Sequence, residues 1–326
     1  MANYLISGVA GFIAYRVAEL LTDSGHLVYG VDNLNDAYDV RLKEYRLKKL
    51  MVRSNFHFLK GDISERTIIE SLKPWLPEKV DGVINLAARA GVRSSLTDPW
   101  VYVDTNLTGT LNLLELCRQR PVGKFILAST SSLYAEKSDP PFKETDDTDH
   151  PLQPYAASKK GAEAMAFAYH HLYGIDVTVL RYFTVYGPAG RPDMVMFRFC
   201  QWIAEGRPVI VNGDGEQSRG FTYLDDIARG TIEALKPLGY AVINLGGHEV
   251  ITINHLIHML EYRIGKRARI QYEAFHHADV HTNQADIRTA KVLLGWEPQV
   301  NLEEGVTHLV DWYMAERDWV SQVETP

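Results

Sequence analysis

The sequence predicts an α/β protein, with a doubly wound parallel sheet covered by helices and a smaller α/β C-terminal lobe. Three observations predict this class. The chain has 326 residues, 46% of them hydrophobic, which is enough for a large core. Strand-like and helix-like segments alternate up to residue 182. Beyond residue 183 the elements are shorter and are separated by turns rich in glycine and proline.

The alternating segments follow one another in a simple order. Those with strand character are short, apolar and rich in β-branched residues, as in a parallel sheet buried on both faces. Those between them have helical periodicity. We expect strands at residues 4–7, 26–31, 56–59, 82–88, 125–129 and 176–182, and helices at residues 13–23, 40–51, 65–72, 103–118 and 156–173.

This order also predicts a domain division. Residues 1–182 form the first domain, and residues 222–246 return to it. The remainder of residues 183–326 forms the smaller lobe. Residues 321–326 are expected to be a frayed tail.

Composition excludes several classes of function. The chain carries 41 acidic and 34 basic residues, a net charge of −7, which disfavours binding to nucleic acid or anionic membranes. The N-terminal segment does not resemble a signal peptide, and no apolar run reaches the roughly 18–20 residues that span a bilayer. Cys117 and Cys200 lie in apolar stretches and are interpreted as reduced core thiols. No Cys/His pattern has metal-ligand spacing, so we expect no metal site. The N-terminal segment and the reduced thiols predict a cytoplasmic protein.

A glycine motif follows the first strand, where a helix begins. Gly8 and Gly11 allow a sharp turn that approaches a pyrophosphate closely, beside the positive end of the helix dipole. Ala14 occupies the third position of the motif. Asp32 ends the second strand, where a carboxylate binds ribose hydroxyls and repels a 2′-phosphate. The pattern favours NAD over NADP; the alternative is that Asp32 only caps a turn or helix.

Tyr155 and Lys159 are spaced so that they share one face of a helix. A neighbouring ammonium lowers the pKa of a phenol and makes it a usable base. Tyr45 and Lys49 have the same spacing, but we interpret their segment as a solvated basic helix face. Tyr155 instead follows the hydroxyl-rich residues 129–132, at the sheet edge where ligands bind.

Together these motifs resemble the extended short-chain dehydrogenases/reductases, NAD-dependent enzymes with a Rossmann-like sheet. The matching segments are residues 8–13, 85–88, 129–134, 155–159, 181–183, 219–226 and 294–298. The resemblance implies a catalytic set of Thr130, Tyr155 and Lys159. It implies cofactor contacts from Gly8, Gly11, Phe12, Ile13, Asp32, Asn33, Asp62, Ile63, Ala87, Asn106, Tyr155, Lys159 and Tyr182.

Within that family, residues 31–43 and 183–194 resemble the UDP-glucuronate 4-epimerases. This resemblance implies that Thr184 and Arg191 recognise the sugar carboxylate, for which a guanidinium is a permanently charged fork. Ser132 stands where decarboxylases and 4,6-dehydratases typically carry glutamate, which favours simple oxidation and re-reduction at C4. The implied substrate contacts are Arg93, Ser131, Ser132, Thr184, Arg191, Arg219 and Asp279.

The resemblance thus implies an isomerase that converts UDP-glucuronate to UDP-galacturonate through a 4-keto intermediate. NAD would stay tightly bound and be regenerated in each turnover. The family is commonly homodimeric, through helix 103–118 and the helix that carries Tyr155. Gly220 replaces the usual aspartate after Arg219, and His276 stands where arginine is common.

Alternatives remain open at this point. The substrate could be a neutral sugar nucleotide such as UDP-glucose or UDP-N-acetylglucosamine, although Thr184 and Arg191 argue against this. The enzyme could be a UDP-glucuronate decarboxylase or a net oxidoreductase. Outside enzymes, the chain could be a non-catalytic NAD-binding protein, but such proteins typically lose the tyrosine or the lysine, and both are present here.

Overall fold

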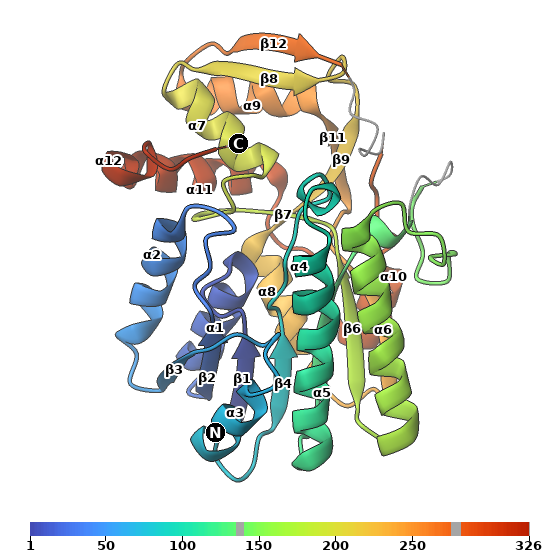
Figure 1. The fold of residues 1–326 in the computed structure, drawn as a ribbon. Coiled ribbons are helices and arrows are strands. Elements are labelled where there is room, and N and C mark those ends of the chain that lie inside the picture. The colour runs from blue at the N-terminus through green and yellow to red at the C-terminus, as the bar shows by residue number, and fades with distance from the viewer. Residues whose placement is uncertain (135–139, 275–281, 326) are drawn as a thin grey trace.

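A parallel sheet of seven strands forms the centre of the computed structural model, which describes residues 1–134, 140–274 and 282–325 (Figure 1). The strand order is β10-β6-β5-β4-β1-β2-β3, and each neighbouring pair is parallel. This confirms the predicted doubly wound class. The strands are β1 (Asn3–Ser7), β2 (Leu27–Asp32), β3 (Phe56–Lys60), β4 (Gly82–Asn85), β5 (Phe125–Thr130), β6 (Val177–Tyr182) and β10 (Tyr240–Leu245).

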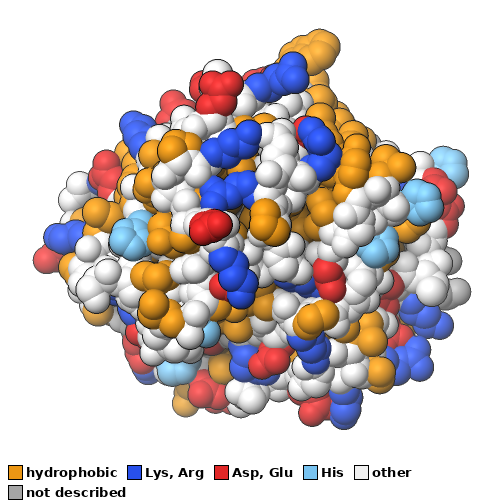
Figure 2. Space-filling view, turned by 90° about the horizontal axis from the view of Figure 1, so that it is seen from below, with side chains coloured by type: hydrophobic (Ala, Val, Ile, Leu, Met, Phe, Trp, Pro, Cys, Tyr) orange, Lys and Arg blue, Asp and Glu red, His pale blue; other side chains and the backbone are white. Residues whose placement is uncertain are grey.

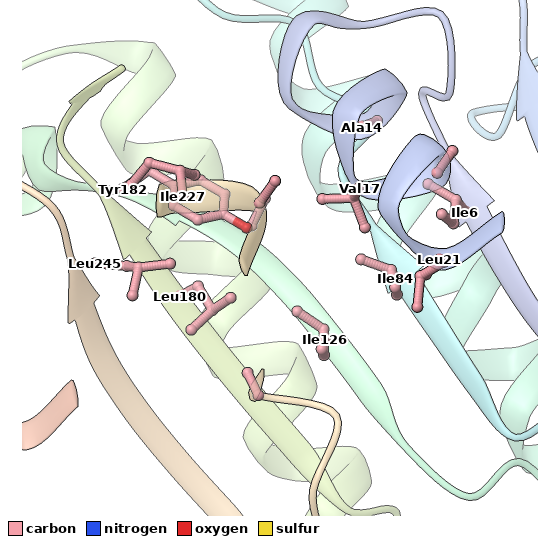
Figure 3. Close-up of a cluster of buried hydrophobic side chains, with 14 of the residues drawn as sticks. Ile6, Ala14, Val17, Leu21, Ile84, Ile126, Leu180, Tyr182, Ile227 and Leu245 are labelled. Atoms are coloured by element: carbon pink, nitrogen blue, oxygen red, sulfur yellow. The ribbon is translucent and has the colours of Figure 1, made fainter. Parts of the chain in front are cut away.

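Helices cover both faces of this sheet because the strands are apolar on both sides. One face packs against α1 (Phe12–Asp23), α8 (Leu224–Glu233) and α10 (Arg288–Leu294), with α2 (Val40–Met51) beside α1. Figure 3 shows Val17 and Leu21 of α1 pointing toward Ile6 and Ile84 of the sheet, and Ile227 of α8 beside Tyr182. The other face packs against α3 (Ile68–Trp75), α5 (Gly109–Gln119) and α6 (Pro154–Tyr173).

Several predicted boundaries are wrong, including those of the helix expected at residues 65–72, which is α3 and runs from Ile68 to Trp75. The helix expected at residues 103–118 begins earlier, with α4 (Trp100–Tyr102), and passes through a π-helical segment, η2 (Val103–Thr108), before α5. The strand expected at residues 82–88 ends at Asn85, where the chain leaves the sheet to pass over the glycine turn of β1. The early end of the strand goes with the close approach of Ala87 to Gly8, a tertiary contact that local periodicity does not encode.

The C-terminal lobe lies above the carboxyl edge of the sheet (Figure 1). It contains a sheet of order β11-β9-β7 and a parallel pair of β12 with β8. Its apolar core is separate from those that cover the central sheet. The elements are β7 (Thr184–Tyr186), α7 (Val195–Ala204), β8 (Pro208–Asn212), β9 (Ser218–Tyr223), β11 (Glu249–Thr252), α9 (Ile253–Ile264), β12 (Arg269–Glu273), α11 (Leu302–Ala315) and α12 (Arg317–Val320).

The expectation of a frayed C-terminal tail is wrong for residues 321–325. The side chain of Val323 is fully buried among apolar residues of the lobe. The buried Gln201 amide donates to the carbonyls of Val320 and Val323, at 3.1 and 2.8 Å. The Trp202 indole donates to Thr325 Oγ1 at 2.9 Å. The tail is therefore docked against α7 by an apolar anchor and by side chains that satisfy its backbone.

The interpretation of residues 45–49 as a solvated basic face is wrong for one residue. Lys48 and Lys49 are exposed as expected, and the Lys49 ammonium lies 4.7 Å from the centre of the Tyr45 ring. Arg46, which lies between Tyr45 and Lys49 in the sequence, is fully buried. A surface pattern read from charge alone cannot distinguish a solvated guanidinium from one that other segments enclose.

Cys117 on α5 and Cys200 on α7 are unpaired and buried, as predicted, and burial raises the pKa of both thiols. In the described part of the chain, every helix is too short or too polar to cross a bilayer. Figure 2 shows acidic and basic side chains interspersed on the face opposite the C-terminal lobe.

Candidate active site

A cavity of about 1500 Å³ lies between the carboxyl edge of the central sheet and the C-terminal lobe. Its location follows from the topology: the strand order reverses between β1 and β4, where ligands bind in doubly wound sheets. Predicted site residues that line it are Gly8, Gly11, Phe12, Ile13, Asp32, Asn33, Asp62, Ile63, Ala87, Arg93, Thr130, Ser131, Ser132, Tyr155, Lys159, Tyr182, Thr184, Arg191 and Arg219.

The glycine turn at the end of β1 is shaped for a close ligand. Gly8 has φ +71°, and a Cβ there would lie 2.6 Å from the Cα of Ala87. A Cβ on Gly11 would lie 2.8 Å from the Gly8 carbonyl. In the described chain no side chain caps the first turn of α1, so its N–H groups face the cavity edge. This turn and uncapped helix fit the pyrophosphate of NAD.

Carboxylates follow β2 and β3 at the same edge. Asp32 accepts hydrogen bonds from the backbone N–H of Ala10 at 3.1 Å and of Leu34 at 2.8 Å, which leaves further lone pairs for ribose hydroxyls. Asp62 accepts from Asn33 Nδ2 at 2.7 Å and from Ser64. Burial raises the pKa of Asp62, but these hydrogen bonds outweigh it and hold the pKa below its usual range. Both carboxylates are therefore orientated by the protein itself.

The predicted catalytic side chains come from β5 and α6. The α6 helix begins with a proline in its first turn and ends at Gly174, which has φ +67°. Tyr155 lies in that first turn, close enough to Thr130 at the end of β5 for the threonine to lower the pKa of the phenol. Lys159, one turn later, is buried and donates from Nζ to the carbonyl of Ala128 at 2.9 Å.

Burial and neighbouring groups act in opposite directions on the pKa of the Tyr155 phenol. Burial raises the pKa of the Tyr155 phenol, and the opposing effects come from the Thr130 hydrogen bond and the charge of Arg191. Lys159 lies one turn further along α6, where its ammonium is held by the Ala128 carbonyl, and burial lowers its own pKa to about 8. Thr130 and Arg191 thus favour the phenolate in this geometry.

Asn106 does not lie among the described residues that line the cavity. Its side chain accepts from the backbone N–H of Arg89 at 2.9 Å and donates to the Arg89 carbonyl and to Ser158 Oγ. Arg89 itself lines the cavity. Asn106 therefore ties the loop after β4 to α6 and contributes through that loop.

Arg191 and its neighbours form the wall toward the C-terminal lobe. The Arg191 guanidinium donates to both carboxylate oxygens of Asp193, at 3.1 and 2.5 Å. Burial lowers the pKa of Arg191, but the adjacent carboxylate more than offsets this and raises it above its ordinary value. Thr184 and Ser132 line the same cavity, so it offers a fixed cation close to Tyr155 and two further hydroxyls.

The fold explains why Gly220 follows Arg219 in place of the aspartate that is usual in the family. A Cβ on Gly220 would lie 2.4 Å from the Gly247 carbonyl and 2.7 Å from the Asn283 carbonyl, so there is no room for aspartate. Arg219 lines the cavity and donates to the Ser218 carbonyl. Asp279 and His276 lie outside the described residues.

Sequence reasoning missed several cavity residues. Asn283 donates from Nδ2 to Ser131 Oγ at 3.2 Å, and its carbonyl accepts from Gly220. Asp193, two residues after Arg191, could have been suspected as a partner from its opposite charge. The others lie on separate elements and share no local motif: Lys43, Arg198, Arg207, Gln217, Asn283, Glu324 and Thr325.

Known proteins resemble this chain over almost its whole length. A UDP-glucuronate 4-epimerase from Thermodesulfobacterium geofontis is 57% identical over 317 residues, covering 96% of both chains. The crystal structure of UDP-glucuronic acid 4-epimerase from Bacillus cereus, in complex with UDP-glucuronic acid and NAD, has a TM-score of 0.90. It is 36% identical and covers 96% of this chain and 99% of its own. A UDP-glucose 4-epimerase from Thermotoga maritima has a TM-score of 0.89 at 32% identity, covering 97% of this chain and 99% of its own.

The family model described as GDP-mannose 4,6 dehydratase matches residues 5–309, which include most of β1 and all the other strands of the central sheet. The match, the identity to the curated relative and the shared fold agree with one another. The chain belongs to the GDP-mannose 4,6-dehydratase family of extended short-chain dehydrogenases/reductases.

Proposed function

We propose that this protein is an NAD-dependent UDP-glucuronate 4-epimerase, an isomerase that interconverts UDP-glucuronate and UDP-galacturonate. The observation that carries this proposal is the presence of Thr130, Tyr155 and Arg191 in one cavity. The first two can exchange a proton with a sugar hydroxyl, and the third can hold a carboxylate. The 57% identity to a UDP-glucuronate 4-epimerase supports the same activity.

The reaction begins with proton transfer at the C4 oxygen. Tyr155, as phenolate, takes the C4 hydroxyl proton, and Thr130 hydrogen-bonds the same oxygen. NAD, when bound, accepts the C4 hydride and returns it. Lys159 holds α6 against β5 and so fixes the distance between Tyr155 and Thr130. After the 4-keto sugar has rotated to present its opposite face, Tyr155 returns the proton to the C4 oxygen, and the opposite configuration at C4 results.

The carboxylate end decides between epimerisation and loss of carbon dioxide. The 4-keto intermediate is a β-keto acid, and the C5–C6 bond breaks most easily when it lies parallel to the carbonyl π orbitals. Arg191, anchored by Asp193, can hold the carboxylate away from that alignment with the help of Thr184. Ser132 has no carboxyl group to support proton transfer at C5, which favours re-reduction at C4.

The remaining assignments are proposals of the same kind. Residues 1–182 and 222–246 bind NAD, and the rest of residues 183–326 binds mainly the nucleotide sugar. The predicted cofactor and substrate contacts keep their roles, with Asn106 acting through the Arg89 loop. NAD stays bound through turnover, and the enzyme acts in the cytoplasm, where unpaired thiols such as Cys117 and Cys200 are common.

We further propose that the enzyme is a homodimer formed through α5 and α6. Large apolar side chains are exposed on α6 and on α4 and η2, which lead directly into α5, and this supports a partner there. They are Trp100, Val103, Phe167, Leu172 and Tyr173. Analytical ultracentrifugation tests this proposal: a monomer at micromolar concentration contradicts it.

The activity is tested by incubating purified protein with UDP-glucuronate and no added NAD. Products are separated by anion-exchange chromatography and identified by NMR. UDP-galacturonate that disappears in the Tyr155→Phe variant supports the proposal. UDP-xylose or a 4-keto pentose as sole product would indicate decarboxylation. Turnover of UDP-glucose but not of UDP-glucuronate would indicate a neutral-sugar epimerase, and no turnover with added NAD would favour a binding protein.

A further inference from the structure

A buried arginine outside the predicted site joins two of its loops. Arg46 on α2 is fully buried, and all of its guanidinium nitrogens donate hydrogen bonds. Nε and Nη2 donate to the Ala189 carbonyl at 3.0 and 2.7 Å, and Nη2 also donates to Gly190 at 3.1 Å. Nη1 donates to the Ala10 carbonyl at 3.0 Å and to the Tyr38 hydroxyl at 2.8 Å.

These partners belong to the two halves of the active site. Ala10 lies inside the glycine turn that faces the cofactor position. Ala189 and Gly190 immediately precede Arg191, the candidate carboxylate clamp. One guanidinium therefore spans from the glycine turn to the clamp loop, which we define as residues 187–193.

The clamp loop has a conformation that needs outside support. Ala189 has φ +54°, in the left-handed region that non-glycine residues rarely adopt. Such a residue persists only where its surroundings hold it. Two hydrogen bonds from Arg46 to the Ala189 carbonyl hold this conformation in place.

Arg46 also has an unusual charge balance. Among the described residues, its hydrogen bonds end on backbone carbonyls and a phenol, and none ends on a carboxylate. Its guanidinium carbon lies 5.6 Å from the centre of the Tyr38 ring and 5.9 Å from that of Phe12. A buried cation kept without a carboxylate partner is costly, which argues for a role beyond packing.

We propose that Arg46 is a positioning residue that fixes the clamp loop relative to the glycine turn, and so keeps Arg191 where it suppresses decarboxylation. This inference rests on the proposed epimerase function. Arg46 touches neither reacting atom and acts through the backbone of Ala189 and Gly190.

The side reaction that Arg46 suppresses has a defined balance. After the C4 hydride and the hydroxyl proton have left, the C5–C6 bond of the β-keto acid breaks and carbon dioxide departs. The bonding electron pair forms the C4–C5 enolate, which takes a proton from water at C5. The product is a 4-keto pentose nucleotide, and the hydride stays on the cofactor, which accumulates in its reduced form.

The matched variants are Arg46→Met, which keeps much of the apolar volume but removes every donor, and Lys48→Met on the exposed side of the same helix. The measurement is the partition ratio, the 4-keto pentose formed per UDP-galacturonate formed. Because both products come from folded enzyme, this ratio does not depend on the folded fraction. The near-ultraviolet absorbance of reduced nicotinamide gives an independent measure.

We expect Arg46→Met to raise the partition ratio at least about tenfold, since freeing the clamp loop removes a transition-state constraint. Lys48→Met should leave it unchanged. If Arg46→Met does not fold, Arg46→Lys is measured instead, because its single ammonium cannot reach both loops and should give a smaller rise.

The outcomes separate this inference from the proposed function. A wild-type enzyme that forms no UDP-galacturonate contradicts the function itself. If wild type epimerises and the Arg46 variants epimerise with the same partition ratio, the positioning role of Arg46 is wrong. The proposed function is then unaffected. Adding Ala189→Gly to Arg46→Met should bring the ratio back toward wild type, because glycine adopts positive φ without strain.

Discussion

The ion pair between Arg181 and Glu163 lies directly beneath the catalytic strand end and allows a quantitative test. The two side chains are 4% and 5% exposed. Arg181 donates to both carboxylate oxygens of Glu163, at 2.9 and 2.8 Å. Ser129, the residue before Thr130, donates to the same carboxylate at 2.5 Å, and Arg181 also donates to the Tyr134 hydroxyl at 3.0 Å.

The expected cost follows from this burial. Arg181→Met leaves the Glu163 carboxylate buried with one hydroxyl partner, and removing one member of a buried pair costs about 3–5 kcal/mol. Glu163→Gln keeps an acceptor for Ser129 but leaves the guanidinium uncompensated. In the double variant both charges are gone, so we expect a coupling of about 1–3 kcal/mol relative to the sum of the single changes.

The assay is chemical unfolding followed by tryptophan fluorescence, at fixed protein and NAD concentration. Arg263→Met is the control, because Arg263 on α9 pairs with Asp311 on α11, both side chains are exposed to solvent, and the change should cost no more than about 1 kcal/mol. A loss below about 1 kcal/mol for Arg181→Met, or strict additivity in the double variant, would refute the reasoning.

Three further predictions follow from single contacts. Gly220→Asp restores the usual family residue but places a Cβ 2.4 Å from the Gly247 carbonyl, so KM for the UDP-sugar should rise at least about tenfold; an unchanged KM in steady-state kinetics contradicts the stated clash. Burial lowers the pKa of Lys159 from 10.5 to about 8. Between these pH values the unfolded chain therefore binds more protons than the folded chain, and the free-energy cost of the buried charge disappears as pH rises. In unfolding curves of cofactor-free protein, the free energy of unfolding of wild type should rise by about 3 kcal/mol relative to that of Lys159→Met between these pH values. A difference between the two proteins that does not change with pH is the contrary result. Val323→Asp places a charge in the buried tail anchor and should lower stability by about 3 kcal/mol in thermal unfolding; a wild-type melting temperature would show that the tail is undocked.

Much of the fold and of the catalytic set could be predicted from the sequence. The alternation of apolar strands and amphipathic helices determines a parallel sheet, and the glycine turn with Asp32 determines where a dinucleotide fits. Tyr155 and Lys159 share a helix face because of their spacing. These features depend on neighbouring residues, so their pattern is visible along the chain.

Tertiary structure decided the environment of these groups. Arg46 and Lys49 look alike in sequence, yet Arg46 is enclosed by the glycine turn and by a loop more than a hundred residues away, whereas Lys49 is in solvent. Lys159 donates to Ala128 on a neighbouring strand, and residues 321–325 dock on α7. Burial and hydrogen-bond partners depend on which distant segments meet, and the desolvation that tunes charge and pKa exists only after they have met.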